Sequence, residues 1–302
     1  MAVRVSVVIP TYESEDFIED ALESVIRQTY SSNHLEVIVV DDASHDDSAQ
    51  VARRFLERQR VRSAIVEHSD NRGPAAARNS GLRVATGDFV QFLDADDRLA
   101  PHKLALQAEC AAGSDEAIGV VYSSWHYLSL KDGAWETSGP IQEPFVDDDP
   151  VLGILAQPTF WFLGPTLIRR SELERLQGFV EKRSLGEDVE PLLRLAMAGV
   201  RFRAARSATA TLFYRQRPNS LSRAYVVNAE AAQHLLDTLR RAEEFLRARD
   251  PSGELSADAR AILAERYARW TAFFEQRGAE TSDRGTSWLE RLGLSRPIAE
   301  WR

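Results

Sequence analysis

Short apolar runs alternate with helix-periodic segments along the first hundred residues. Runs rich in Val and Ile predict buried strands over Val5–Ile9, Leu35–Val40 and Phe89–Leu93, and a weaker run predicts a strand over Ala64–Val66. Between them, apolar residues recur at helical spacing. These residues are Phe17, Ile18, Ala21, Leu22, Val25 and Ile26 in one helix, and Val51, Ala52, Phe55 and Leu56 in the helix that follows Ser44. A third helix begins at Pro74. The alternation predicts an α/β fold, with a mostly parallel sheet flanked by helices.

The alternation loosens after residue 100. We expect a helix over residues 101–112 and a strand over 120–123, and the Gly- and Pro-rich stretch over 125–149 predicts a hairpin and a surface loop. The later elements are expected to be a strand over 165–169, a short helix from Ser171, a turn at Gly178, a helix from about Glu187, and strands around Arg201 and Leu212.

The last eighty residues have a different pattern, which predicts a helical C-terminal appendage. Apolar positions at helical spacing lie on both sides of a turn at residues 250–253. We therefore expect a first domain over residues 1–223 and a helical region over 224–302. An aromatic stripe from Tyr267 to Phe274 is expected to pack inside, and a homodimer through these helices stays open.

Composition excludes some classes of function. The 302 residues include 37 Lys and Arg against 46 Asp and Glu, and the formal charge of −9 argues against nucleic-acid binding. The single cysteine, Cys110, suits a reducing compartment and is expected to be a small buried hydrophobe. No apolar stretch approaches about 18 residues, so we expect a cytoplasmic protein whose only membrane contact would be peripheral.

Polar residues directly follow three of the predicted strands. Ligands of open α/β sheets bind beyond the carboxyl ends of the strands, so chemistry should concentrate there. The residues at these ends are Thr11, Tyr12 and Glu13, then Asp41 and Asp42, and then Asp94, Asp96 and Asp97. Carboxylates that converge on one edge repel each other unless a cation is present, and carboxylate oxygens suit Mg²⁺ or Mn²⁺. The alternative is that these acids cap helices or face solvent.

Five ordered segments resemble the successive motifs of the family-two glycosyltransferases. Four of them are Val5–Glu13, Val40–Ser44, Asn71–Gly81 and Phe92–Asp97, and the fifth runs from Gly178 through Glu187 and Asp188 to Leu195. Five motifs in order are far more specific than one, and together they cover roughly the first 220 residues. The resemblance implies a GT-A type, Rossmann-like fold, with a nucleotide-binding half over residues 1–100 and an acceptor-side half over 101–223.

The resemblance also implies a role for each matching residue on the donor side. Thr11, Tyr12 and Glu13 would surround the base and ribose, and Asp42 would accept from a ring nitrogen, which favours uracil or thymine. Arg78 would lie by the nucleotide, Asp94 would contact ribose or sugar, and Asp97 would support the loop. Asp96 would bind the Mn²⁺ or Mg²⁺ ion that bridges the two phosphates of the donor.

On the acceptor side, the family places a catalytic base at Asp188, with Glu187 beside it to orient the acceptor. The alternative is that both acids complement a helix N-terminus. Arg215 and Arg217 lie where relatives often carry an arginine and a histidine near the donor phosphates, so Arg217 replaces the histidine and cannot ligate a metal. Trp125 and Trp161 are candidates for stacking on a sugar, although a large aromatic residue is more often in the core.

The sequence therefore predicts an inverting, metal-dependent transferase that moves a sugar from a UDP- or dTDP-sugar to a hydroxyl of a glycan or glycolipid. A noncatalytic nucleotide-sugar-binding subunit of a glycan-assembly complex is the alternative. A nucleotidyltransferase would need a glycine-rich loop with Arg or Lys after the first strand, and Pro10–Glu13 is nothing like that.

Overall fold

The computed structural model describes residues 3–113, 117–143, 148–157, 162–181, 186–217 and 229–276. The chain forms two compact units. The first comprises Met1–Pro144, Trp161–Lys182 and Ala198–Pro218, and the second comprises Phe145–Phe160, Arg183–Met197 and Asn219–Arg302. The sequence predicted one boundary after residue 223. The division differs because two helices from the middle of the chain pack with the C-terminal helices.

The first unit is built on a seven-stranded sheet with the strand order β10-β6-β9-β4-β1-β2-β3. The sheet is mostly parallel, as predicted, and only β9 runs antiparallel to its neighbours β4 and β6. Its strands are β1 (Val5–Thr11), β2 (Leu35–Asp41), β3 (Arg62–Glu67), β4 (Phe89–Phe92), β6 (Val120–Tyr122), β9 (Thr166–Arg169) and β10 (Phe202–Ala204).

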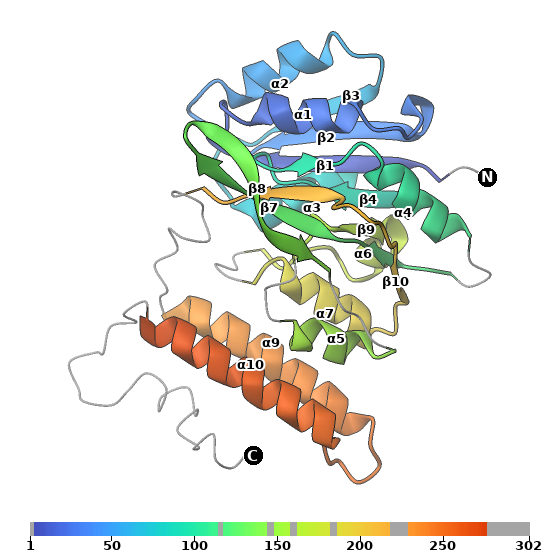
Figure 1. Ribbon diagram of the computed structural model, residues 1–302, viewed down its shortest axis with the longest axis vertical. Coiled ribbons are helices and arrows are strands. Elements are labelled where there is room, and N and C mark those ends of the chain that lie inside the picture. The colour runs from blue at the N-terminus through green and yellow to red at the C-terminus, as the bar shows by residue number, and fades with distance from the viewer. Residues whose placement is uncertain are drawn as a thin grey trace. The chain divides into compact units, whose positions relative to one another are not determined.

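Helices cover both faces of this sheet, because β1 and β2 are apolar on both sides. Side chains alternate between the faces of a strand. Val7 and Val37 lie in one core cluster with apolar residues of α1 (Ile18–Ile26) and α2 (Ser48–Leu56), which lie side by side in Figure 1. Val8, on the other face, packs against α3 (Pro74–Val84). The remaining helices of this unit are the 3₁₀ turn η1 (Ser32–His34), α4 (Lys103–Ala112) and α6 (Arg170–Arg175).

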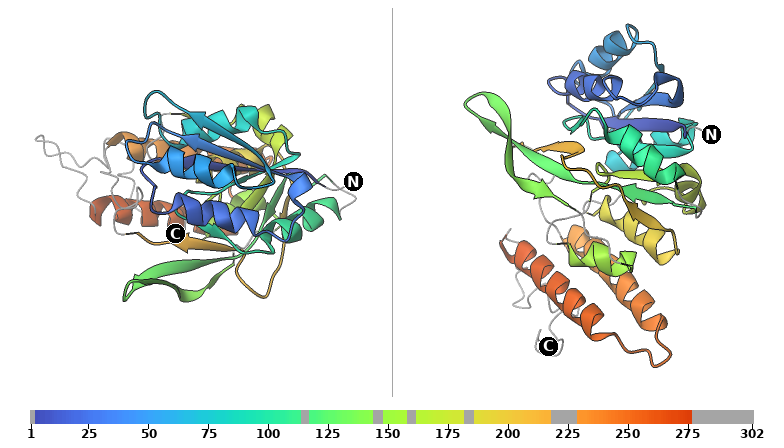
Figure 2. Two further views of the ribbon diagram at one scale, coloured as in Figure 1. Left: turned by 90° about the horizontal axis from the view of Figure 1, so that it is seen from above. Right: turned by 45° about the vertical axis from the view of Figure 1, so that its right-hand side comes forward.

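A second sheet in this unit has four strands in the order β5-β11-β7-β8. Its strands are β5 (Arg98–Leu99), β7 (Trp125–Lys131), β8 (Ala134–Gln142) and β11 (Leu212–Arg215). The predicted hairpin is confirmed as β7 and β8, joined by Asp132 and Gly133 with φ of 50° and 83°. Figure 2 shows this hairpin as the long green ribbon that extends from the first unit.

The second unit is helical. It contains α5 (Pro150–Ala156), α7 (Val189–Met197), α9 (Ala229–Ala248) and α10 (Ala257–Gln276). The helices α9 and α10 run side by side (Figure 1), and both occupy the region where the sequence predicted them. The sequence did not predict α5, which begins after the capping carboxylate of Asp149. Among the described residues, no helix is both long enough and apolar enough to span a bilayer.

The predicted aromatic stripe of the tail is partly described. Trp270 is buried and Tyr267 is half-buried, which agrees with packing inside the unit, whereas the burial of Phe273 and Phe274 lies outside the described features. Cys110 is half-buried and not fully enclosed, with Sγ 3.7 Å from the carbonyl oxygen of Ala204.

Candidate active site

The candidate site lies at the carboxyl edge of the parallel strands, where β1, β2 and β4 end. Thr11 is the last residue of β1, and its carbonyl oxygen accepts a 2.9 Å hydrogen bond from the amide of Asp42. Thr11 Oγ1 and Asp41 Oδ1 are buried without a hydrogen-bond partner among the described residues. Buried polar groups are normally paired, so these two atoms are exceptions at this edge of the sheet.

The residues after Thr11 form the rim of this edge. Tyr12 is half-buried and Glu13 is exposed, with a φ of 47° that is unfavourable for a non-glycine residue. The amide of Glu13 donates to Ser44 Oγ at 3.0 Å, and His45 Nδ1 lies 3.4 Å from its carboxylate. The loops after β1 and β2 are therefore linked to each other. The positive φ of Glu13 is a local backbone strain, and strained residues of this kind are concentrated at functional sites.

Asp42 is buried and has a full set of partners within the protein. Its Oδ1 lies 2.6 Å from His68 Nδ1 and accepts from the amide of Arg72 at 3.0 Å. Its Oδ2 accepts from the amides of Arg72 at 3.1 Å and Gly73 at 2.7 Å. Asp42 thus fixes the loop before α3. A base N–H at this carboxylate would have to share or displace one of these donors, a cost that the sequence did not reveal.

Arg78 and Asp94, two of the predicted donor-site residues, form an ion pair. Arg78 lies on α3 and is 3% exposed, and its Nη2 donates to Asp94 Oδ1 at 3.0 Å. The guanidinium also lies 5.9 Å from the centre of the Phe179 ring. Asp94 is the most accessible acid of the loop after β4, because its side chain is 36% exposed. Its other oxygen can therefore reach a ligand.

Asp96 and Arg217 form an ion pair at the same edge. Arg217 Nε lies 2.6 Å from Asp96 Oδ2, and the two side chains are 23% and 17% exposed. Burial raises the pKa of Asp96, Arg217 opposes that shift, and Asp94 adds to it. The residue predicted to bind metal and the residue predicted to lie by the donor phosphates are thus in direct contact.

Asp97 is buried beneath this loop. It is 1% exposed, and its Oδ1 accepts from the amide of Arg215 at 2.9 Å. Burial raises the pKa of Asp97 well above its ordinary value, and the nearby charges of Asp96 and Asp94 raise it further. Arg215 also donates to the carbonyl oxygen of Asp96 at 3.1 Å and to the carboxylate of Asp20. The loop after β4 is therefore fastened to β11.

A divalent ion fits this edge only in a limited way. Asp94 and Asp96 lie close enough to Asp97 to raise its pKa, but no group of three His, Cys, Asp or Glu arranged to hold a metal occurs among the described residues. Both carboxylate oxygens of Asp42 already accept hydrogen bonds from within the protein, and Asp97 is buried. Mg²⁺ is often held by one or two carboxylates together with substrate phosphates, and Asp96 offers that kind of ligand. The residues therefore fit an ion that is completed by the donor.

The predicted acceptor-side residues belong to the second unit. Glu187 and Asp188 are half-buried and lie in the turn immediately before α7, while the other predicted site residues lie in the first unit. Trp125 is 2% exposed and packs edge-on against Phe162, with ring centres 5.3 Å apart. It is a core residue and does not stack on a sugar. Trp161 lies outside the described residues.

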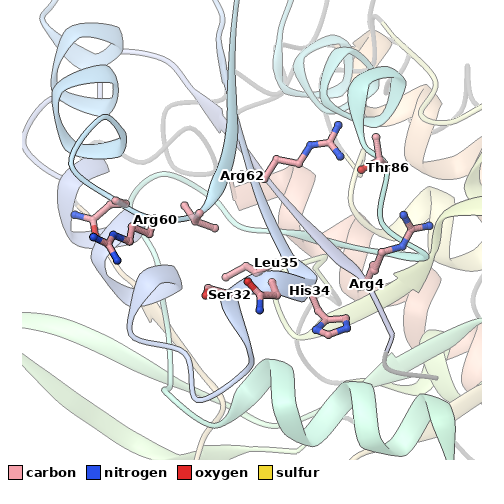
Figure 3. A pocket seen from close by; sticks show the side chains of 10 residues that line it. Arg4, Ser32, His34, Leu35, Arg60, Arg62 and Thr86 are labelled. Carbon is pink, nitrogen blue, oxygen red and sulfur yellow. The ribbon is translucent and has the colours of Figure 1, made fainter.

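A hollow of about 450 Å³ lies at the opposite, amino-terminal edge of the strands (Figure 3). Arg4, His34, Arg60 and Arg62 line it, together with polar backbone and side chains. Arg62 is held by Glu36 at 2.9 Å and Arg4 by Asp88 at 3.3 Å. This hollow contains none of the predicted site residues, and ligands of open α/β sheets bind at the other edge.

Several residues of the site were missed in the sequence. His68 links Asp42 to Ser80 Oγ at 2.8 Å, and Phe17 lies under the guanidinium groups of both Arg215 and Arg217, at 5.3 and 4.8 Å from the ring centre. Trp135, on the hairpin, lies 5.4 Å from Arg215. The one available signal was position, since His68 directly follows β3 and so lies at the same edge as Asp42.

The fold and this edge define a class of protein. A mostly parallel sheet with an Asp-x-Asp loop at its carboxyl edge, flanked by helices and followed by a smaller second sheet, is the GT-A type architecture. Residues 6–138 match the sequence profile described as Glycosyl transferase family 2. The match lies within the first unit and covers under half of the chain.

Individual relatives agree with the family. The chain is 34% identical over 178 residues to an uncharacterized glycosyltransferase of Nostoc sp., which is 57% of this chain and 53% of that one. It is 31% identical over 170 residues to the poly(ribitol-phosphate) beta-N-acetylglucosaminyltransferase TarS of Staphylococcus aureus, which is 56% of this chain and 28% of TarS. The matches thus span about half of the first relative and under a third of the second.

Solved structures agree in fold. Residues 1–349 of S. aureus TarS, in complex with UDP-GlcNAc, align with a TM-score of 0.69 at 23% identity, over 96% of this chain and 78% of that one. The mannosyltransferase PcManGT from Pyrobaculum calidifontis, in complex with GDP-Man and Mn²⁺, aligns with a TM-score of 0.61 at 25% identity, over 100% and 83% of the two chains.

Proposed function

We propose that this protein is an inverting glycosyltransferase that moves a sugar from a UDP- or dTDP-sugar to a hydroxyl of a glycan or glycolipid acceptor. The observation that carries the proposal is the loop after β4. Its acids Asp94 and Asp96 remain accessible, while Arg78, Arg215 and Arg217 fix them in place. A loop of this kind can receive the ribose and the diphosphate of a nucleotide sugar at the carboxyl edge of the sheet.

The base and ribose would lie against the ends of β1 and β2. Thr11 Oγ1 and Asp41 Oδ1 are the buried atoms without a partner among the described residues, and a nucleoside presents donors and acceptors that can complete them. Tyr12 and Glu13 would form the rim, and Asp42 would hold the loop or share an oxygen with the base. The UDP-GlcNAc named for TarS supports a uridine donor, and the GDP-Man named for PcManGT supports testing other bases.

We propose Asp96 as the residue that would hold Mn²⁺ or Mg²⁺. When bound, such an ion neutralises the charge of the departing diphosphate. Arg217 and Arg78 place permanent positive charge beside Asp96 and Asp94, and Asp94 would orient the ribose or the sugar. Asp97 keeps the loop in shape from within the protein.

Inversion requires a base that takes the proton of the acceptor hydroxyl as that oxygen attacks the anomeric carbon. We propose Asp188 for this role and Glu187 as the residue that orients the acceptor. The half-buried turn before α7 leaves part of both side chains accessible. The acceptor named for TarS, a poly(ribitol phosphate), supports a polymeric acceptor. Transfer assays with candidate acceptors would identify the acceptor of this protein.

The first test is a panel of nucleotides and nucleotide sugars, measured by thermal shift with Mn²⁺ and with EDTA. A ligand that binds only the folded state raises the melting temperature according to its affinity and concentration. We expect UDP, dTDP or their sugars to raise the melting temperature and ADP-sugars to leave it unchanged. No shift with any nucleotide under either condition would contradict the proposal.

The second test is Asp188→Asn, which keeps the size of the side chain and removes the base. We expect transfer and donor hydrolysis to fall by about 10²-fold or more, because general-base catalysis contributes about 10²- to 10⁴-fold. Nucleotide affinity should stay within about twofold, since the binding residues belong to the first unit. Asp258→Asn, an exposed acid in the first turn of α10, is the matched control.

These measurements also separate the enzyme from a noncatalytic binding subunit. Tight nucleotide-sugar binding by the wild type, with no hydrolysis and no transfer to any acceptor, would favour the binding subunit. Turnover that Asp188→Asn leaves unchanged would show that another group takes the proton.

A further inference from the structure

Arg217 is held in one orientation beside Asp96. Its Nε lies 2.6 Å from Asp96 Oδ2, and the ring of Phe17 supports its guanidinium at 4.8 Å. No hydrogen bond from its two terminal nitrogens is found among the described residues, and the side chain is 23% exposed. A positive group that is oriented, accessible and only partly satisfied is suited to bind an anion.

A second arginine, Arg215, fastens the loop after β4 from within the protein. Arg215 already joins β11 to the loop, through its amide on Asp97, its Nη1 on the carbonyl oxygen of Asp96 and its Nη2 on Asp20. Arg215 is 2% exposed, whereas Arg217 reaches the surface two residues later. The two arginines therefore have separate roles, because Arg215 fastens the loop and Arg217 presents charge.

Arg217 contacts one carboxylate oxygen of Asp96, the residue that we propose as the metal ligand. A metal at Asp96 would have to share Oδ2 with the guanidinium or displace it. The sequence resemblance puts a histidine here in relatives, and a guanidinium has no lone pair with which to ligate a metal. It does have planar N–H donors that match phosphate oxygens, and its charge persists at any working pH.

We propose that Arg217 is the resident cation for the donor diphosphate, so that nucleoside diphosphates bind this site without a divalent ion. The inference rests on the proposed function, because it assigns a residue to the phosphates of that donor. Metal would then add to the affinity without being required for it.

The test measures the affinity of UDP, dTDP and GDP by isothermal titration calorimetry, in EDTA and in Mn²⁺. For wild type we expect the best of these ligands to bind with affinities within about threefold under the two conditions. Arg217→Ala should weaken metal-free binding by about 10- to 100-fold, as the loss of charge-assisted hydrogen bonds predicts. Arg217→Lys, which keeps the charge, should lose less than about tenfold.

Arg217→His is the decisive variant, because it restores a side chain that can ligate a metal. We expect its metal-free affinity to fall as in Arg217→Ala and Mn²⁺ to recover about tenfold or more. Arg62→Ala is the matched control, since Arg62 forms a similar Nε-to-carboxylate ion pair with Glu36, at 2.9 Å, away from the site. It should change neither affinity, and circular dichroism checks that each variant is folded.

Two results would overturn the inference. One is a wild-type affinity that Mn²⁺ strengthens by tenfold or more. The other is an Arg217→Ala variant that binds the nucleotide in EDTA as tightly as wild type does. Failure of the proposed function gives a different result, because then none of the nucleotides binds any variant with or without Mn²⁺.

Discussion

At the scale of single residues, Asp97 is an acid that the loop after β4 buries next to two other acids. Its carboxyl group is enclosed, and one oxygen accepts from the amide of Arg215 while the other has no partner among the described residues. Burial and the neighbouring acids raise the pKa of Asp97 well above its usual value. At pH values between the unfolded and the folded pKa, the folded protein therefore binds a proton at Asp97 that the unfolded chain has released.

This shift predicts the pH dependence of stability. A folded-state pKa above the unfolded one means that stability is greatest below the unfolded pKa and falls as pH rises toward the folded pKa. We expect the free energy of unfolding of wild type, measured by urea at pH values upward from 4, to fall relative to that of Asp97→Asn by at most about 1.4 kcal/mol per pH unit. The free energy of unfolding of Asp258→Asn should follow the same pH dependence as that of wild type. A wild-type stability that rises with pH relative to Asp97→Asn would show that the fold stabilises Asp97 as the carboxylate.

Most individual site residues could be predicted from the sequence, because they follow apolar strands at one edge and carry a family pattern. The partners that hold them could not. Arg215 reaches Asp20 across 195 positions, and Arg78 reaches Asp94 through the packing of α3. No local periodicity encodes such pairs. The full engagement of Asp42 by His68 and by two backbone amides was hidden for the same reason.

At the scale of elements, α3 is pressed closely onto the sheet. Gly81 has no side chain where a Cβ atom would lie 2.3 Å from Val8 Cγ1 and 3.3 Å from Val40 Cγ2. The lack of a side chain lets this helix approach β1 and β2. Its N-terminal loop thereby reaches Asp42, and its Arg78 reaches Asp94.

Gly81→Ala should therefore destabilise the protein by about 1–3 kcal/mol, because an extra methyl group in a packed interface forces the surrounding side chains to move. The higher helix propensity of Ala opposes this by about 1 kcal/mol at most. Chemical denaturation measures the difference, and Arg83→Ala, an exposed position on the same helix, should stay within about 0.5 kcal/mol. A neutral Gly81→Ala would mean that α3 moves outward without cost.

The elements that the sequence predicted correctly are those with strong apolar patterns, such as β1, β2, α1 and α10. The two-residue strand β5 is too short to show any periodicity, and the seven-residue helix α5 directly follows the stretch over 125–149 whose Gly and Pro residues predicted a hairpin and a loop. The direction of β9 depends on its neighbours β4 and β6, which lie far from it in sequence. Tertiary pairing, not local propensity, decided these features.

At the scale of the whole molecule, Arg266 organises the second unit. It lies on α10 and is 6% exposed, and its guanidinium donates to carbonyl oxygens at the end of α5, with Nε 2.8 Å from the oxygen of Leu155. Nη2 also donates to the carbonyl oxygen of Gln157. Burial lowers the pKa of Arg266 to about 10, so the group stays charged at neutral pH. These bonds satisfy the final carbonyls that every helix leaves open.

Arg266→Met should lower the free energy of unfolding by about 2–3 kcal/mol, because buried carbonyl groups lose their donor. Differential scanning calorimetry measures the loss, and Arg269→Ala, an exposed ion pair one turn along, should cost less than about 0.5 kcal/mol. Nucleotide affinity should stay within about twofold, since the proposed donor residues belong to the other unit. A large loss of affinity would indicate that donor binding depends on the helices.

The boundaries between the two units fall after residues 144, 160, 182, 197 and 218, so neither unit is one continuous piece of chain. Strand β9, which lies between β4 and β6 in the sheet, follows the first segment of the chain that belongs to the helical unit. Protein engineering must respect this interleaving. A gene cut at any one of these boundaries would give an N-terminal fragment without part of its own sheet or a helical fragment without α5, and replacing one unit by that of another protein would require several joints.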